Sequence, residues 1–243
     1  NGEDIIDIIL EQEATPRFIA RHLYNFFVAD EPQVPAWPFK EARDPAAVET
    51  LAMTLIEANY ELKPVLRVLF NSDFFKEARY KKVRNPAEVV VGTLKFVGDM
   101  TGPDPRWGDL PHQTEYMGQT LMDPPTVEGW HTGKEWINSG AFINRVNFVA
   151  DRVKDTTLPG IEDVIRRIAE SNGTDMTPED LVDHCLDMMG PLTVEPDTHE
   201  ELVEQAQVDG PVSWSTEEDY SISSKRIGDV MALIAGTREY QMG

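Results

Sequence analysis

The sequence predicts an all-α protein. Apolar residues recur at spacings of three and four in the long segments, and alternating strand patterns are almost absent. At four positions a side chain that can cap a helix stands directly before a proline, whose missing N–H costs nothing in a first helical turn. These pairs are Thr15-Pro16, Asp44-Pro45, Asn85-Pro86 and Thr177-Pro178. We expect about nine or ten helices.

Apolar faces predict the helices one by one, because residues three and four apart lie on one side of a helix. Phe26, Leu66 and Leu94 stand centrally on their faces, and we expect all three to be buried. The faces up to residue 100 are Phe18, Ile19, His22, Leu23, Phe26 and Phe27; Val48, Leu51, Ala52, Leu55 and Ile56; Val65, Leu66, Leu69 and Phe70; Val89, Val90, Leu94 and Val97. Those beyond residue 155 are Ile161, Val164, Ile165 and Ile168; Leu181, Val182, Cys185 and Met189; Ile227, Val230, Met231 and Ile234.

Charge is unevenly distributed along the 243 residues. The chain has 22 basic and 43 acidic residues, which gives a net charge of −21. Residues 1–155 carry −7 and residues 156–243 carry −14. We therefore predict a helical part over 1–155, with a long irregular segment at 101–140, and an acidic helical part over 156–243 packed against it. The boundary falls at Thr156–Gly160, where Pro159 and Gly160 interrupt the helical pattern.

Composition excludes several classes of protein. A net charge of −21 opposes binding to nucleic acid or to an anionic lipid surface. No apolar run approaches the ~20 residues of a membrane span. Cys185 is the single cysteine, so the chain forms no internal disulfide. The sequence starts at Asn1, from which we expect a processed or truncated piece.

The segment after residue 116 carries the most distinctive motifs. It reads Met117-Gly118-Gln119, Pro124-Pro125-Thr126-Val127-Glu128-Gly129-Trp130, Trp136-Ile137-Asn138 and Asn144-Arg145-Val146-Asn147-Phe148. This order resembles the C-terminal signature of the bacterial domain-of-unknown-function family 1800. The upstream strings Ala20–Phe27, Asn71–Phe75 and Lys82–Pro86, and the closing Thr237–Gln241, are similar to other parts of the same family.

The resemblance implies an exported, extracytoplasmic bacterial protein whose additional N-terminal part is missing here. It also implies two partners: that missing part, and a neighbouring-gene, hydrolase-like protein of domain-of-unknown-function family 1501. The family supplies no catalytic residue to carry over.

The irregular segment contains candidate catalytic residues, but no recognisable catalytic motif. Glu128, His131 and Glu135 could act as acid and base groups if the segment folds back on itself, although loop carboxylates are more often turn formers or helix caps. His112 and His131 are far apart and lie in no zinc motif, and Cys185 has no cysteine partner. We predict no metal and no cofactor.

Three tryptophans and one arginine are candidates for binding. Trp107, Trp130 and Trp136 could stack on a sugar or a partner side chain, or pin the segment to the core; we favour the second role and expect Trp130 to be largely buried. Arg145 could clamp Glu128 or Glu135, or bind an anionic ligand.

A short basic run departs from the overall acidity. Five bases fall within nine residues, next to Tyr80, and could form a docking patch or neutralise acidic helices of the same fold. They are Lys76, Arg79, Lys81, Lys82 and Arg84.

Two functions follow from these observations. The first is a non-catalytic helical module for binding or assembly in an exported protein. The second is an extracytoplasmic hydrolase whose pocket is formed by residues 107–138. We rank the first above the second, because no recognisable catalytic constellation is present.

Overall fold

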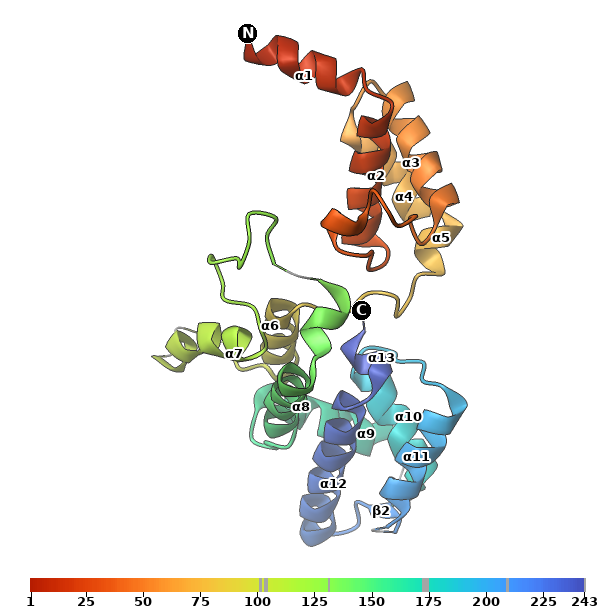
Figure 1. Ribbon diagram of the computed structural model, residues 1–243. Coiled ribbons are helices and arrows are strands. Elements are labelled where there is room, and N and C mark those ends of the chain that lie inside the picture. Colours follow the sequence, from red (N-terminus) through yellow and green to blue (C-terminus); the bar gives the residue numbers. More distant parts are fainter. Residues whose placement is uncertain (101, 103–104, 131, 172–174, 209, 243) are drawn as a thin grey trace. The chain divides into compact units, whose positions relative to one another are not determined.

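The computed structural model describes residues 1–242 apart from 101, 103–104, 131, 172–174 and 209. Within this range lie thirteen α-helices, three short 3-10 helices and one two-stranded antiparallel sheet (Figure 1). The prediction of an all-α protein is confirmed, with more helices than the apolar faces indicated. In the described part of the chain, no helix is long and apolar enough to cross a membrane.

The chain forms two compact units. Unit 1 comprises residues 1–83 with 132–133, and unit 2 comprises residues 84–130 with 134–242. The elements in chain order are α1 (Gly2–Leu10), α2 (Ala14–Phe27), η1 (Val34–Ala36), α3 (Pro45–Glu57), α4 (Leu62–Asn71), α5 (Asp73–Lys76), α6 (Pro86–Val97), η2 (Pro105–Asp109), α7 (Leu110–Tyr116), η3 (Gly133–Ile137), α8 (Ser139–Val153), α9 (Pro159–Ser171), β1 (Asp175–Met176), α10 (Pro178–Met188), α11 (Pro196–Gln207), β2 (Val212–Ser213), α12 (Glu217–Ala235) and α13 (Arg238–Gln241).

Three of the four predicted helix starts are confirmed. Asp44, Asn85 and Thr177 cap α3, α6 and α10 through their side chains, and a proline follows each. The prediction was wrong for Thr15-Pro16, because α2 already begins at Ala14. There the Thr15 hydroxyl donates to the carbonyl of Ile9 at 2.5 Å and so ties α2 to the end of α1.

Unit 1 packs α2 and α3 side by side, with α4 against α3 (Figure 1). Its core contains Ala20 and Tyr24 of α2, Leu51 and Leu55 of α3, and Leu69 of α4. The faces predicted for α3 and α4 supply half of its buried residues, but Ile56 and Phe70, which were placed on those faces, are exposed.

The face predicted for α2 was wrong in part: Ile19, Leu23 and Phe27 pack partly buried against the unit 1 core, but Phe18 and Phe26 do not. The buried side of α2 is the stripe of Pro16, Ala20 and Tyr24, whereas Phe18 is 50% exposed and Phe26 is 68% exposed. Because α2 carries aromatic and aliphatic residues on several sides, apolar spacing alone does not select the side that packs on α3. Leu66 of α4 is half-buried rather than buried.

Unit 2 contains the faces predicted for α6, α9, α10 and α12, and all of their residues are buried in one core. The two strands pair antiparallel, with Asp175 opposite Ser213 and Met176 opposite Val212. Segment 101–140, expected to be irregular, contains η2, α7 and η3.

The boundary predicted at Thr156–Gly160 lies inside unit 2. Val149 and Val153 of α8 share a core with Ile161 of α9, so the chain on both sides of this point packs together. Gly160 opens α9 next to the end of α6, where a Cβ atom would overlap the Phe96 carbonyl oxygen. The Pro-Gly pair thus begins a helix at a close contact instead of separating two domains.

Substitution of Phe26, Leu66 and Leu94 by alanine should lower the stability of the protein by different amounts. Leu94→Ala should destabilise the protein by ~2–5 kcal/mol, because Leu94 is 1% exposed within the unit 2 core. Phe26→Ala should cost less than ~1 kcal/mol, and Leu66→Ala should fall between them. Chemical denaturation of the three variants measures these differences. Equal losses for Phe26→Ala and Leu94→Ala would contradict the observed orientation of α2.

Candidate binding groove

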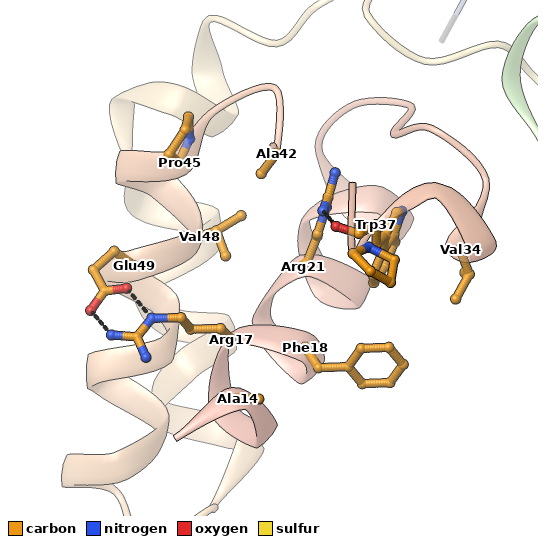
Figure 2. Close-up of a pocket in the computed structure, with 11 residues that line it drawn as sticks. Ala14, Arg17, Phe18, Arg21, Val34, Trp37, Ala42, Pro45, Val48 and Glu49 are labelled. Atoms are coloured by element: carbon orange, nitrogen blue, oxygen red, sulfur yellow. Dashed lines mark hydrogen bonds and ion pairs between the residues drawn. The ribbon is translucent and has the colours of Figure 1, made fainter. Parts of the chain in front are cut away.

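An open groove of about 560 Å³ lies in unit 1 between α2, α3 and the segment that contains η1 (Figure 2). Figure 2 shows Phe18 and Trp37 on one side and Pro45, Val48 and Glu49 of α3 on the other. The residues that line it are Ala14, Arg17, Phe18, Arg21, Val34, Trp37, Pro38, Ala42, Pro45, Val48 and Glu49. Most of this lining is apolar, which is typical of a site for an apolar ligand group.

The wall that carries Trp37 is positioned by a buried arginine. Arg21, 8% exposed, donates from Nε to the Glu31 carboxylate at 2.8 Å, and its Nη2 lies 2.6 Å from the same oxygen. Its Nη groups also donate to the backbone carbonyls of residues 40 and 41 at 2.9 and 3.0 Å. The guanidinium carbon lies 4.6 Å from the centre of the Trp37 ring. One side chain therefore holds the segment beyond α2 against that helix.

The Glu31 carboxylate is held from several sides as well. Its second oxygen accepts a hydrogen bond from the Arg43 backbone N–H at 2.8 Å. The indole N–H of Trp37 donates to the Pro32 carbonyl at 2.6 Å, which fixes the orientation of the ring. The groove is thus preformed, because its aromatic wall needs no ligand to stay in place.

An ion pair closes the rim on the α3 side. Arg17 of α2 donates to both carboxylate oxygens of Glu49, at 2.7 and 2.9 Å (Figure 2). The hydrogen bond from Arg17 lowers the pKa of the Glu49 carboxyl, and the same bond raises the pKa of Arg17. Both side chains are about half exposed, so this pair contributes little to stability. Its consequence is a rim without net charge.

His22 lies behind the aromatic wall. Its ring centre is 4.6 Å from that of Phe18 and 4.6 Å from that of Trp37. Burial between these rings lowers the pKa of His22 below its ordinary value. Sequence reasoning placed Phe18 and His22 on a core face and did not connect them with Trp37, which follows 15 residues later on a segment whose path the local sequence does not specify.

The three tryptophans singled out from the sequence have different environments. Trp136 is buried, at 5% exposure. Trp107 and Trp130 are half-buried, and the Trp130 indole N–H donates to the Thr120 carbonyl at 3.0 Å. The largely buried indole that was expected at Trp130 is found at Trp136.

The acid and base candidates do not line the groove. Glu128 is exposed in a tight turn, where its backbone N–H donates to the Thr126 hydroxyl at 3.2 Å. Glu135 is exposed in η3, and His131 lies outside the described residues. Among the residues that the structure describes, no three His, Cys, Asp or Glu side chains are grouped to hold a metal ion.

The sequence suggested that Arg145 could clamp Glu128 or Glu135, but it bonds to neither. It is fully buried on α8, and its Nε donates to the side-chain oxygen of Gln241 at 2.8 Å. The reason is the packing of α8: this helix packs against α12 within unit 2, and Arg145 bonds to Gln241 of α13, the helix that follows α12.

The basic run is divided between the two units at residues 83 and 84. Lys76 lies 3.4 Å from Asp73, and Lys82 lies 3.8 Å from Asp30. Arg84 belongs to unit 2, with its guanidinium 4.7 Å from the centre of the Tyr240 ring. Lys76 and Lys82 thus have acidic neighbours within unit 1, and a docking role for Lys76, Arg79, Lys81, Lys82 and Arg84 stays a prediction.

Substitution of the two tryptophans near η3 should distinguish their roles. Trp136→Ala should lower stability by ~3–5 kcal/mol, the usual cost of truncating a buried large aromatic residue. Trp130→Ala should cost only about 1–2 kcal/mol, since the ring is half-buried and loses one hydrogen bond. Denaturant titrations measure both. A larger loss at Trp130 than at Trp136 would contradict this assignment.

Acidification should destabilise the wild type through His22. Its pKa is lowered in the folded protein, so below the ordinary value the unfolded chain takes up a proton that the folded chain resists, and stability falls. His22→Phe keeps an aromatic ring between Phe18 and Trp37 but does not titrate. Thermal melts from about pH 7.5 to about pH 5 should show a steeper decline for the wild type than for the variant. Parallel declines would exclude this contribution, because the carboxylates are common to both proteins.

The model of the family described as "Protein of unknown function (DUF1800)" matches residues 1–242. No curated protein and no solved structure matches the chain. The match covers the motifs around Gly118, Trp130 and Arg145 from which the resemblance was inferred, and the chain belongs to the DUF1800 family.

Proposed function

We propose that unit 1 is a binding module, and that the chain acts through this module without catalysing a reaction. The observation that carries the proposal is the preformed apolar groove between α2 and α3. Phe18 is half exposed at its edge, and Trp37 is held in place by Arg21. Apolar surface that is fixed before binding costs little conformational entropy when a ligand covers it.

The chemistry of the groove specifies its occupant. Among the described residues that line it, Glu49 is the single carboxylate, and Arg17 already holds both of its oxygens. A charged ligand group therefore gains little at the rim, whereas an aromatic or branched aliphatic group can contact Phe18 and Trp37. The occupant is a segment of a partner protein that offers an apolar side chain with uncharged neighbours.

The same observation disfavours hydrolysis in the groove. A carboxylate that serves as general base must be able to accept a proton from water or substrate, and the ion pair stabilises the charged, bonded form of Glu49. Neither Glu128 nor Glu135 supplies a replacement there. The groove is therefore suited to recognition and not to acid–base catalysis.

For the partner, we propose the hydrolase-like protein of domain-of-unknown-function family 1501 that the family resemblance implies, or an N-terminal part of the kind that the same resemblance implies. For the compartment, we propose an extracytoplasmic location on the same resemblance. The groove is of a size to accept a few side chains, so a short protruding segment of either partner would suffice.

The groove can be tested before its partner is known. We would titrate the ¹⁵N-labelled chain with N-acetyltryptophanamide, N-acetylleucinamide and N-acetyllysinamide. The first two should shift backbone resonances of α2, α3 and η1 with dissociation constants in the millimolar range, and the lysine derivative should not. Phe18→Ser should weaken binding of the tryptophan derivative by at least about fivefold.

A matched control is available on the same unit. Phe39 is 89% exposed and does not line the groove, so Phe39→Ser should leave binding unchanged while removing a comparable apolar surface. Thermal melts check that both variants remain folded. Equal binding of all three probes, or equal weakening by the two serine variants, would refute the proposal.

A further inference from the structure

Unit 2 buries an arginine whose charge is not neutralised by a direct partner. Arg145 is 0% exposed, and its Nε donates to the neutral amide oxygen of Gln241 at 2.8 Å. Its Nη1 and Nη2 are buried, and neither has a hydrogen-bond partner among the residues that the structure describes. Two donor groups on the outer edge of this guanidinium thus lack a hydrogen-bond acceptor within the described structure.

The surrounding charges make this arrangement more costly. Burial, and to a smaller extent the charge of the nearby Arg84 guanidinium, lower the pKa of Arg145 to about 10. A pKa of about 10 still leaves Arg145 protonated at neutral pH. Two cations therefore lie near each other, one of them fully removed from water.

The described carboxylate that favours the charged form of Arg145, Glu88, is engaged elsewhere. Glu88 raises the pKa of Arg145 through its charge, but it is exposed on the first turn of α6. Its carboxylate accepts a hydrogen bond from the Asn85 backbone N–H at 2.7 Å and completes the capping box of that helix. Glu88 can thus offset part of the charge from a distance, without satisfying the open Nη donors.

A buried charge without a partner is strongly destabilising, so binding of an external partner would be favoured. A water molecule could accept hydrogen bonds from Nη1 and Nη2, but it would not neutralise the charge. An oxyanion does both, because two of its oxygens match the two parallel Nη donors of a guanidinium.

We propose that the Nη edge of Arg145, with Arg84 beside it, binds one small oxyanion in unit 2. The ligand carries a planar or tetrahedral group with two accessible oxygens. Carboxylate, phosphate and sulfate share this property. Residues 84–243 carry a net charge of −17, which repels anions in general. Binding therefore depends on the two local arginines, and simple ions without this geometry, such as chloride, are poor ligands.

The test uses the whole chain, dialysed into chloride buffer. Phosphate, sulfate and acetate are added separately at matched ionic strength, and binding is followed by thermal melting and by the Nε–H resonances of the arginines. We expect saturable binding of one ion per chain, a higher melting temperature than in chloride, and a shift of the Arg145 Nε–H resonance. A response to phosphate and sulfate identifies an inorganic ligand, and a response to acetate alone identifies a carboxylate.

Variants then assign the site. Arg145→Met should weaken binding at least ~10-fold, and Arg84→Gln, a change at a partly exposed position, should weaken it to a smaller extent. Arg166→Gln is the matched control, because Arg166 is an exposed, ion-paired arginine of α9 in the same unit and should bind as the wild type does.

If Arg145→Met fails to fold, measurements on the wild type and on the two glutamine variants still decide. No saturable effect beyond chloride in the wild type overturns it, and so does binding that leaves the Arg145 resonance unchanged. Equal weakening by Arg84→Gln and Arg166→Gln also overturns it, because the effect would then reflect overall charge.

Discussion

The geometry of unit 1 depends on the buried pair between Arg21 and Glu31. Between α2 and α3 the backbone hydrogen bonds around η1 are local, so they do not determine how this segment lies on α2. Arg21 does so by donating to Glu31 and to carbonyls of residues 40 and 41, and Glu31 accepts from the Arg43 N–H. Loss of either partner would leave the other charge buried, which is costly. The groove wall is therefore tied to α2 by a polar contact.

Unit 2 is held by different means. Its helices present single apolar stripes that meet in one core, and close backbone contacts are made where glycine removes the side chain. Gly98 ends α6 at a positive φ of 73°, and a Cβ there would lie 2.9 Å from the Gly160 nitrogen. Gly228 similarly allows α12 to approach Lys154 at the end of α8. Apolar burial stabilises this unit, and glycine sets how closely its helices cross.

The contrast explains which features the sequence predicted. Ile161, Ile165 and Ile168 lie on the only apolar side of α9, so their burial follows from their spacing. In α2 the bulky rings surround much of the helix, and Ala20, the least conspicuous apolar residue, faces the core. A helical period identifies a side only when the other sides are polar.

The binding features were less predictable, because their partners are distant or are backbone atoms. Arg21 bonds to carbonyl groups, which every residue has, so no residue type signals the contact. Arg145 was recognised as unusual from its motif, but its partner Gln241 lies 96 residues away. The groove likewise combines α2 with Trp37, whose position depends on the path of an irregular segment. The motifs identified the family correctly because a family match requires only residue order.

The position of α1 has a consequence for local stability. None of its residues is buried, and its isoleucines Ile5, Ile6, Ile8 and Ile9 are each more than half exposed. Its ties to the rest of the unit are few and include the bond from the Tyr60 hydroxyl to the Leu10 carbonyl at 2.7 Å. A nine-residue helix gains little from propensity alone. Amide protons of α1 should therefore exchange with solvent through local opening, long before those of α3, whose apolar side is enclosed.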